Sequence, residues 1–189
     1  EEKMDARSEH RVHVDKEVLS ALRNAAEDLP PPEHADAFGE FFDRYGDARV
    51  VLLGEATHGT SEFYRARAAI SRHLIQYHGF NVVAVEADWP DAARIDRYIR
   101  QIARDERDTP AFSRFPEWMW RNVEVLEFVE WLRSHNERSV AQEVEFRGLD
   151  IYSLRASIAT VLAYLDRVDP AAARMARYRY GCLTPWQED

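Results

Sequence analysis

Residues 50–60 read Val-Val-Leu-Leu-Gly-Glu-Ala-Thr-His-Gly-Thr, and the rest of the chain is interpreted outward from this stretch. An apolar run ends in a glycine, a carboxylate (Glu55) and, three residues later, an imidazole (His58). Short continuous apolar runs are typical of buried strands in parallel sheets. In open α/β sheets, ligands bind beyond the carboxyl ends of the strands. The stretch therefore predicts that Glu55 and His58 lie at a binding crevice.

The segments on either side of this stretch alternate between strand and helix patterns. We expect strands at residues 49–54, 80–86 and 145–149, and helices at 15–29, 38–45, 60–78, 92–103, 122–132, 153–167 and 171–180. This order predicts an α/β fold, a three-layer α/β/α sandwich with a mostly parallel sheet. Three strands are fewer than a typical sheet has, so we expect an incomplete fragment of a longer protein. Residues 1–14 are predicted to be loose, and residues 15–189 to form the N-terminal part of a single catalytic domain.

Composition restricts the class of protein. The chain has 189 residues, of which 46% are hydrophobic and 31% charged, as expected for a globular domain with a core. Its net charge of -9 argues against a nucleic-acid partner, and no apolar run has the length of a membrane span. A single cysteine, Cys182, and the lack of a signal peptide pattern predict a cytoplasmic protein.

The pair Glu55 and His58 is the strongest candidate for catalysis. A neutral imidazole can take a proton from water near neutral pH, and a carboxylate that accepts its N–H fixes the tautomer. We interpret His58 as a general base and Glu55 as the group that orients it. The alternative is that His58 only caps or packs the following helix.

Arg67 and Glu86 are expected to complete this candidate site. Arg67 falls within the apolar stripe of the helix at 60–78, where a guanidinium needs anionic partners, and Glu55 and Glu86 are the nearest candidates. Glu86 ends an otherwise apolar strand, which is costly for a carboxylate without a partner or a wet cleft. The alternatives are an Arg67 whose charged end reaches solvent and a Glu86 at an ordinary exposed strand terminus.

The aromatic segment at residues 115–122 supplies candidates for substrate binding. It reads Phe-Pro-Glu-Trp-Met-Trp-Arg-Asn and predicts either an apolar cleft or a core anchor for the next helix. We take Trp118, Trp120 and Arg121 as substrate-binding candidates. Asp150, after the third expected strand, is a weaker substrate-binding candidate, because a turn residue at a helix entry is the better interpretation of it.

No metal or cofactor is predicted from the motifs. The other histidines, including His73, His78 and His135, show no spacing typical of zinc ligands. The sequence lacks a Gly-x-Ser-x-Gly elbow, a phosphate-binding loop and a dinucleotide fingerprint. These absences argue against a serine hydrolase and a nucleotide enzyme.

Four spaced motifs in this order resemble the erythromycin esterase family. They are residues 53–64 (Leu-Gly-Glu-Ala-Thr-His-Gly-Thr-Ser-Glu-Phe-Tyr), 85–90 (Val-Glu-Ala-Asp-Trp-Pro), 115–122 and 148–154 (Gly-Leu-Asp-Ile-Tyr-Ser-Leu). The resemblance spans residues 45–185, and several motifs in register are more specific than any one of them.

The resemblance implies an α/β fold and metal-independent hydrolysis of a macrolide lactone, which confers antibiotic resistance. By resemblance the general base is His58, the motif glutamate Glu55, the helix arginine Arg67 and the second-strand glutamate Glu86. The family's greater length implies that further site histidines come from a C-terminal half. Two alternatives stay open: a metal-dependent or carboxylate-pair hydrolase of another bond, and a non-catalytic ligand-binding remnant.

Overall fold

The computed structural model describes residues 16–102, 111, 117–139 and 142–186, and its contacts divide the chain into two compact units, residues 1–30 and 31–189. The first unit contains α1 (Lys16–Ala25), none of whose residues is buried. This helix ends before Leu29, to which the apolar spacing extends. Since an isolated helix without tertiary packing is marginal, a shorter helix is the expected outcome. The predicted loose segment 1–14 lies outside the described residues.

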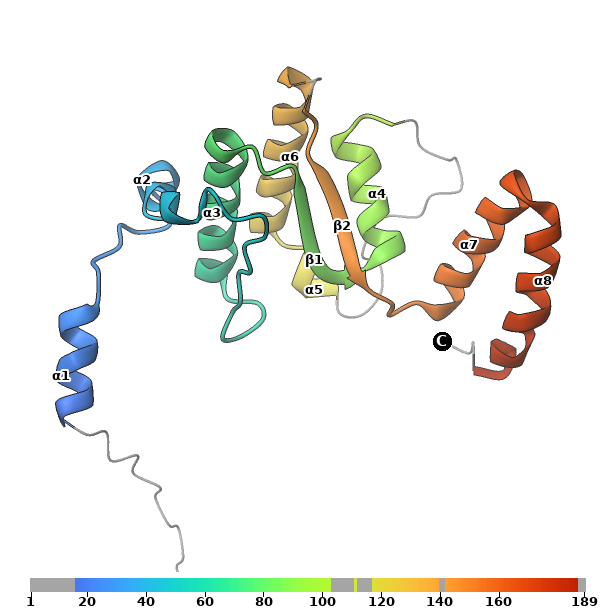
Figure 1. The fold of residues 1–189 in the computed structure, drawn as a ribbon, viewed down its shortest axis with the longest axis horizontal. Coiled ribbons are helices and arrows are strands. Elements are labelled where there is room, and N and C mark those ends of the chain that lie inside the picture. The colour runs from blue at the N-terminus through green and yellow to red at the C-terminus, as the bar shows by residue number, and fades with distance from the viewer. Residues whose placement is uncertain (1–15, 103–110, 112–116, 140–141, 187–189) are drawn as a thin grey trace, which may run out of the picture. The chain divides into compact units, whose positions relative to one another are not determined.

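The second unit is rich in helices and contains two strands among its described residues (Figure 1). Its elements in chain order are α2 (Ala35–Glu40), η1 (Asp43–Tyr45), α3 (Ser61–His78), β1 (Val82–Asp88), α4 (Trp89–Ile99), α5 (Glu117–Trp120), α6 (Val123–Arg138), β2 (Glu145–Asp150), α7 (Leu154–Val168), α8 (Pro170–Tyr180) and η2 (Gly181–Trp186). Most of the predicted helices are present with shifted ends. Two end signals agree with the sequence: Asn122 caps α6 through its side chain, and Gly79 ends α3 in the left-handed conformation.

The sheet consists of β1 and β2, which pair in parallel with Val82 opposite Glu145 and Val85 opposite Gly148. The chain between them passes through α4, α5 and α6, as a parallel connection requires. Gly148 allows close packing, because a Cβ there would lie 2.6 Å from the Ala87 carbonyl oxygen. The predicted α/β class with a parallel sheet is confirmed, whereas the three-layer arrangement stays a prediction.

The predicted strand at residues 49–54 does not form, which corrects the expected strand–helix–strand unit at 49–86. Val51 and Leu53 pack against buried residues, but Val50 is 72% and Leu52 89% exposed. The segment thus alternates like a strand without joining the ladder of the described strands. A cavity of about 100 Å³ is lined by Val51 and by Val82 and Val83 of β1. The apolar run indicated which side chains could be buried, but a strand also needs a backbone partner.

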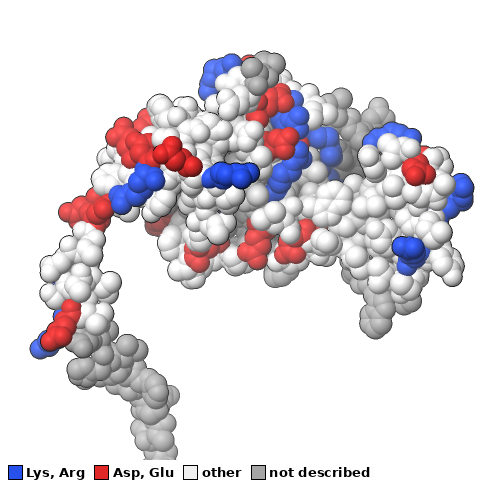
Figure 2. All heavy atoms as spheres, in the orientation of Figure 1, with Lys and Arg blue, Asp and Glu red and all other residues white. Residues whose placement is uncertain are grey.

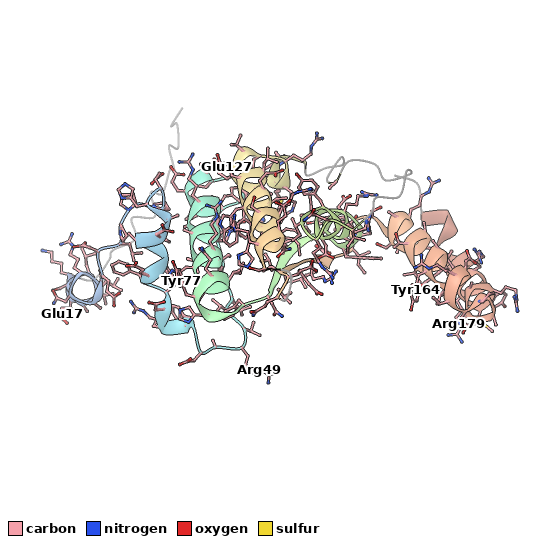
Figure 3. All side chains as sticks on the ribbon, turned by 90° about the horizontal axis from the view of Figure 1, so that it is seen from above. Glu17, Arg49, Tyr77, Glu127, Tyr164 and Arg179 are labelled. Carbon is pink, nitrogen blue, oxygen red and sulfur yellow. The ribbon has the colours of Figure 1, made fainter. Side chains whose placement is uncertain are left out.

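Helix α3 lies between two hydrophobic clusters, and this position fixes the helix firmly. Ile75 belongs to the cluster around Leu132 and Phe146, which joins α3, α6 and the sheet. Ile70 and Leu74 belong to a second cluster with Phe38 of α2. Accordingly, α2 lies beside α3 in both ribbon views (Figures 1 and 3). Because buried apolar side chains anchor α3 on two sides, residues in its first turns have defined positions.

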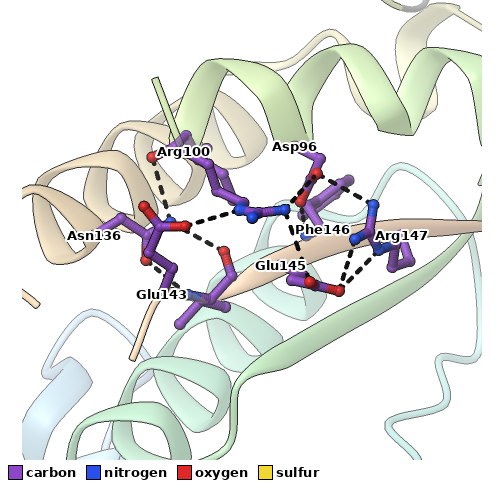
Figure 4. A network of polar contacts seen from close by, with 9 residues as sticks. Asp96, Arg100, Asn136, Glu143, Glu145, Phe146 and Arg147 are labelled. Carbon is purple, nitrogen blue, oxygen red and sulfur yellow. Dashed lines mark hydrogen bonds and ion pairs between the residues drawn. The ribbon is translucent and has the colours of Figure 1, made fainter. Parts of the chain in front are cut away.

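A buried carboxylate, Asp96, holds α4 against β2 (Figure 4). Its side chain accepts the backbone N–H of Phe146 at 2.9 Å and contacts Arg147 Nη1 at 3.1 Å and Arg100 Nη1 at 3.4 Å. A charge that is 4% exposed is tolerated because these donors satisfy both of its oxygens.

Asn136 and Asp88 make further buried links between elements. Asn136 of α6 donates to the carbonyls of Ile99 and Val144 and accepts the Val144 N–H at 2.8 Å. Asp88 at the end of β1 accepts the backbone N–H groups of Tyr152 and Ser153 at 3.1 and 3.2 Å. Burial raises the pKa of Asp88, and the two backbone N–H groups oppose this effect.

The surface is mixed in charge. On the face drawn in Figure 2, Lys and Arg side chains of the described residues are interspersed with Asp and Glu. Within the described ranges, no helix is both long and apolar enough for a membrane crossing.

Candidate active site

The loop before α3 has a local structure that presents His58. Phe63 and Tyr64 donate their backbone N–H groups to the Thr60 carbonyl, so the helix begins directly after Thr60. Gly59 has φ +78°, a left-handed conformation that favours glycine. A Cβ at this position would also lie 2.9 Å from the Trp118 ring. Gly59 therefore allows the chain to turn sharply after His58 while Trp118 packs against the turn.

Glu55 is the centre of a charged cluster. Its Oε1 lies 2.5 Å from Nδ1 of His58, and its Oε2 lies 2.8 Å from Nη2 of Arg67. The exposed fraction of the side chain is 10% for Glu55, 26% for Arg67 and 46% for His58. The contact with Arg67 is an ion pair in which the N–H of Arg67 is not directed at Oε2, so no hydrogen bond forms. Among the described residues, Oε2 is therefore buried and accepts no hydrogen bond. The expected triplet of imidazole, carboxylate and guanidinium is thus brought together.

Tyr64 lies under this cluster and is 7% exposed. The Arg67 guanidinium stacks over its ring at 5.2 Å from the centroid. Burial raises the pKa of Tyr64, and the nearby backbone N–H of Gly59 opposes the rise without forming a regular hydrogen bond. Among the described residues this buried hydroxyl has no hydrogen-bond partner, which is unusual for a buried polar group.

A cavity of about 320 Å³ opens over these groups, within the range of about 300–1,000 Å³ typical of small-molecule sites. Its polar and aromatic lining side chains include Glu55, His58, Tyr64, Arg67, Glu86, Trp120, Glu124 and Phe128. The cavity therefore combines a charged end with an apolar wall.

Glu86 lines the same cavity from β1, on the exposed face of the strand. Within the described part of the chain it makes no hydrogen bond or ion pair, so the expected contact with Arg67 is not formed. Arg67 pairs with Glu55 alone among the two predicted carboxylates. Contact between Glu86 and Arg67 was expected if residues 49–54 formed a strand beside β1, and these residues do not join the sheet.

The substrate-binding candidates separate into two groups. Trp120 lines the cavity, whereas Trp118, 51% exposed, lies against Gly59 and is not among the lining residues. Arg121 and Asp150 are not among the residues that line the cavity. The Asp150 side chain instead accepts the N–H of Ile151 at 2.7 Å, as a turn residue does. The Phe-Pro pair at residues 115–116 lies outside the described residues.

Sequence reasoning missed Glu124 and Ser61. Ser61 Oγ donates to Glu124 Oε1 at 2.5 Å, which joins the start of α3 to the first turn of α6 beside the cavity. The hydrogen bond from Ser61 lowers the pKa of Glu124. The only signal in the sequence was the Asn122 cap, which placed Glu124 in a first turn without indicating what that turn faces.

Comparison with known proteins identifies relatives of the chain. The family model for erythromycin esterase matches residues 75–189. Erythromycin esterase type II of Escherichia coli is 29% identical over 121 residues, which make up 64% of this chain and 28% of that protein. The chain thus covers about a quarter of the length of that curated relative. Glu55, His58 and Arg67 precede the range that the family model matches.

Two solved structures share the fold. A succinoglycan biosynthesis protein superposes with a TM-score of 0.68 at 22% identity, covering 93% of this chain and 45% of its own. A mutant of the erythromycin esterase EreC in its open conformation superposes with a TM-score of 0.51 at 22% identity, covering 77% of this chain and 35% of its own. At these identities the likeness concerns the fold alone.

Proposed function

The chain belongs to the erythromycin esterase family, and on this premise we propose that its protein hydrolyses carboxylic esters with His58 as general base. The observation that carries the proposal is the 2.5 Å contact between Glu55 and His58 at the wall of a cavity. A carboxylate, an imidazole and an adjoining space for a substrate are the parts that base-catalysed hydrolysis needs.

In the proposed reaction His58 activates a water molecule. Glu55 accepts the Nδ1–H of His58, which leaves Nε2 as the proton acceptor. The water oxygen attacks the ester carbonyl carbon while its proton passes to Nε2. When the tetrahedral intermediate collapses, the ester C–O bond breaks and the leaving oxygen takes the proton back from the imidazolium. The products are a carboxylic acid and an alcohol, and in a lactone both stay on one opened chain.

The other polar groups are assigned supporting roles. Arg67 holds the Glu55 carboxylate in position, since its Nη2 lies 2.8 Å from Oε2. Oxyanion stabilisation comes from backbone N–H groups near residues 59–61. Glu86 contributes a negative charge to the same cavity, and Trp118 and Trp120 offer apolar contacts to the substrate.

The geometry favours this chemistry over a metal-dependent or carboxylate-pair hydrolase. One oxygen of Glu55 contacts the His58 imidazole and the other contacts the Arg67 guanidinium, so neither is directed toward Glu86. A shared metal or a carboxylate pair would need these two acids to converge on one bond. The non-catalytic alternative is distinguished by measuring whether the protein turns over an ester at all.

The decisive experiment compares the complete protein with its His58→Asn variant on erythromycin and on a p-nitrophenyl ester. We expect hydrolysis of a simple ester to fall by about 10²- to 10⁴-fold in the variant, the usual contribution of a general base. Equal rates in the two proteins would remove His58 from the mechanism. Ligand binding without turnover would identify a binding remnant, and activity abolished by a chelator and restored by metal would select the metal-dependent reaction.

Macrolides are the finer part of the proposal. Lactone opening of erythromycin by the wild-type protein, detected as a mass increase of one water, is expected. Expression of the protein in a susceptible strain should then raise the macrolide resistance of that strain. We propose that the substrate is a small-molecule ester or lactone and that the reaction takes place in the cytoplasm.

A further inference from the structure

Three metal-ligating side chains meet at the end of α3 that is remote from the candidate active site. Nε2 of His73 lies 2.6 Å from Asp43 Oδ1, and Nε2 of His78 lies 2.7 Å from the same oxygen. One donor atom from each of the three residues lies within 4.8 Å of the other two. The two imidazoles thus converge on one point from different turns of the helix.

The His73 ring is held by its surroundings, and neighbouring glycines make room for both rings. A Cβ on Gly39 would lie 2.6 Å from His73 Cβ, and a Cβ on Gly46 would lie 2.0 Å from His78 Nδ1. Two glycines therefore leave room for the two imidazoles. His73 is also buried, and its ring packs at a tilt against Tyr77, labelled in Figure 3, with ring centroids 4.8 Å apart. Such preorganisation lowers the entropy cost of binding a ligand between the rings.

From this geometry we propose that Asp43, His73 and His78 bind one divalent transition metal ion of the zinc class. Two imidazole nitrogens and one carboxylate oxygen, with water as a fourth ligand, form a common tetrahedral zinc set. Oxygen-only cations such as Mg²⁺ are poorly suited to two nitrogen ligands.

The ligand distances are compatible with a small adjustment on binding. Ligand atoms at about 2.0–2.1 Å from a tetrahedral ion are about 3.3 Å apart, slightly farther than the present contacts to Asp43. Asp43 is the residue that can move, because its side chain is 59% exposed, whereas that of His73 is 6% exposed. The carboxylate would therefore move back by less than an ångström, and the two ring nitrogens, which lie within 4.8 Å of each other, would adjust toward the ion through the partly exposed His78.

The site is separate from the proposed ester-hydrolysing centre. His73 lies twelve residues after Ser61 on the same helix, a distance of about 18 Å along the axis. A bound ion would link η1, which contains Asp43, to the C-terminal end of α3. We therefore expect it to stabilise the fold rather than to take part in hydrolysis.

The full chain is first freed of metal with a chelator, and the chelator is then removed by dialysis. The test is titration of this metal-free protein with metal ions. Zn²⁺ should bind at one ion per chain, and Co²⁺ should give the visible absorption of a tetrahedral site. The variants Asp43→Asn and His78→Gln should weaken Zn²⁺ binding by at least about 100-fold, since loss of a group that only hydrogen-bonds to a metal ligand already costs about 10- to 100-fold. Circular dichroism checks that each variant is folded. Because the Asp43 side chain is exposed, its substitution is the less disruptive of the two for folding.

Two matched histidine variants serve as controls. His34→Gln changes an exposed histidine outside the cluster, and His58→Gln changes the candidate general base. Both should bind Zn²⁺ like the wild type. Three outcomes would overturn the proposal: no stoichiometric binding of Zn²⁺ or Co²⁺, unchanged affinity in Asp43→Asn and His78→Gln, or loss of the ion in His58→Gln.

Discussion

Replacing Glu55 by glutamine tests the charged cluster most directly. The substitution keeps the size of the side chain but removes its charge. A glutamine has one acceptor oxygen, so it can serve His58 or Arg67 but not both, and its NH₂ group would face a donor on the other side. We expect the protein to fold and the imidazolium formed during the reaction to lose its stabilising anion.

The size of the effect follows from the exposure of the two partners. Two unit charges at about 4 Å attract by about 1 kcal/mol in water and about 4 kcal/mol at an effective dielectric constant of about 20. Glu55 is 10% exposed and His58 is 46% exposed, so this pair lies between the two limits. A loss of about 2–3 kcal/mol corresponds to a fall in kcat/KM of roughly 30- to 150-fold.

The assay is the initial rate of p-nitrophenyl ester hydrolysis by the complete protein, with circular dichroism melting curves as a check on folding. Glu62→Gln is the matched control, because Glu62 is exposed in the first turn of α3 and does not line the cavity. Its rate should stay within about twofold of the wild type, as expected for a surface charge. A loss below threefold in Glu55→Gln, or a change confined to KM, would refute the orienting role of Glu55.

Three further predictions concern single side chains. Tyr64→Phe should keep or raise the melting temperature, because the buried hydroxyl has no hydrogen-bond partner among the described residues; a clearly lower melting temperature would show that the hydroxyl is paired in the folded protein. Because burial raises the pKa of Asp88, the folded chain binds its proton more tightly than the unfolded chain, so wild-type stability contributed by this group grows as pH falls toward 3.8. Asp88→Asn should therefore be the more stable protein at pH 7, with the difference shrinking at pH 4 in urea unfolding; a difference that grows at low pH would contradict this sign. Asn136→Ala should lower the free energy of unfolding by about 2–4 kcal/mol in the same assay, because it leaves the buried N–H of Val144 unpaired. A loss below about 1 kcal/mol would show that this N–H finds another partner in the variant.

The parts of the site that the sequence predicted are close together along the chain. Glu55 and His58 are three residues apart, and Arg67 follows on the helix that begins at Ser61, so helix periodicity and one loop suffice to bring them together. The hydrogen bond between Ser61 and Glu124 joins residues 63 positions apart. Such a contact depends on how α6 packs against α3, which periodicity does not specify.

The same distinction explains the fold and the metal-ligand cluster. Helices form from local signals, and most of them were predicted, but pairing of residues 49–54 required a partner strand that no local pattern reveals. His73 and His78 were dismissed because their spacing matches no zinc motif. Their shared partner, Asp43, comes from η1, 30 residues before His73, and only the packing of η1 on α3 brings it there.

Two of the glutamates that line the cavity, Glu55 and Glu86, differ in burial and in partners. Glu55 is nearly buried, and its charge is already matched by Arg67 and by the imidazole, so a substrate gains little from approaching it directly. Glu86 is exposed on the outward face of β1 and has no partner among the described residues. An unmatched carboxylate repels an anion and attracts hydroxyl donors or cations. On this argument we propose that Glu55 organises the base, whereas Glu86 selects neutral or cationic esters and disfavours anionic ones.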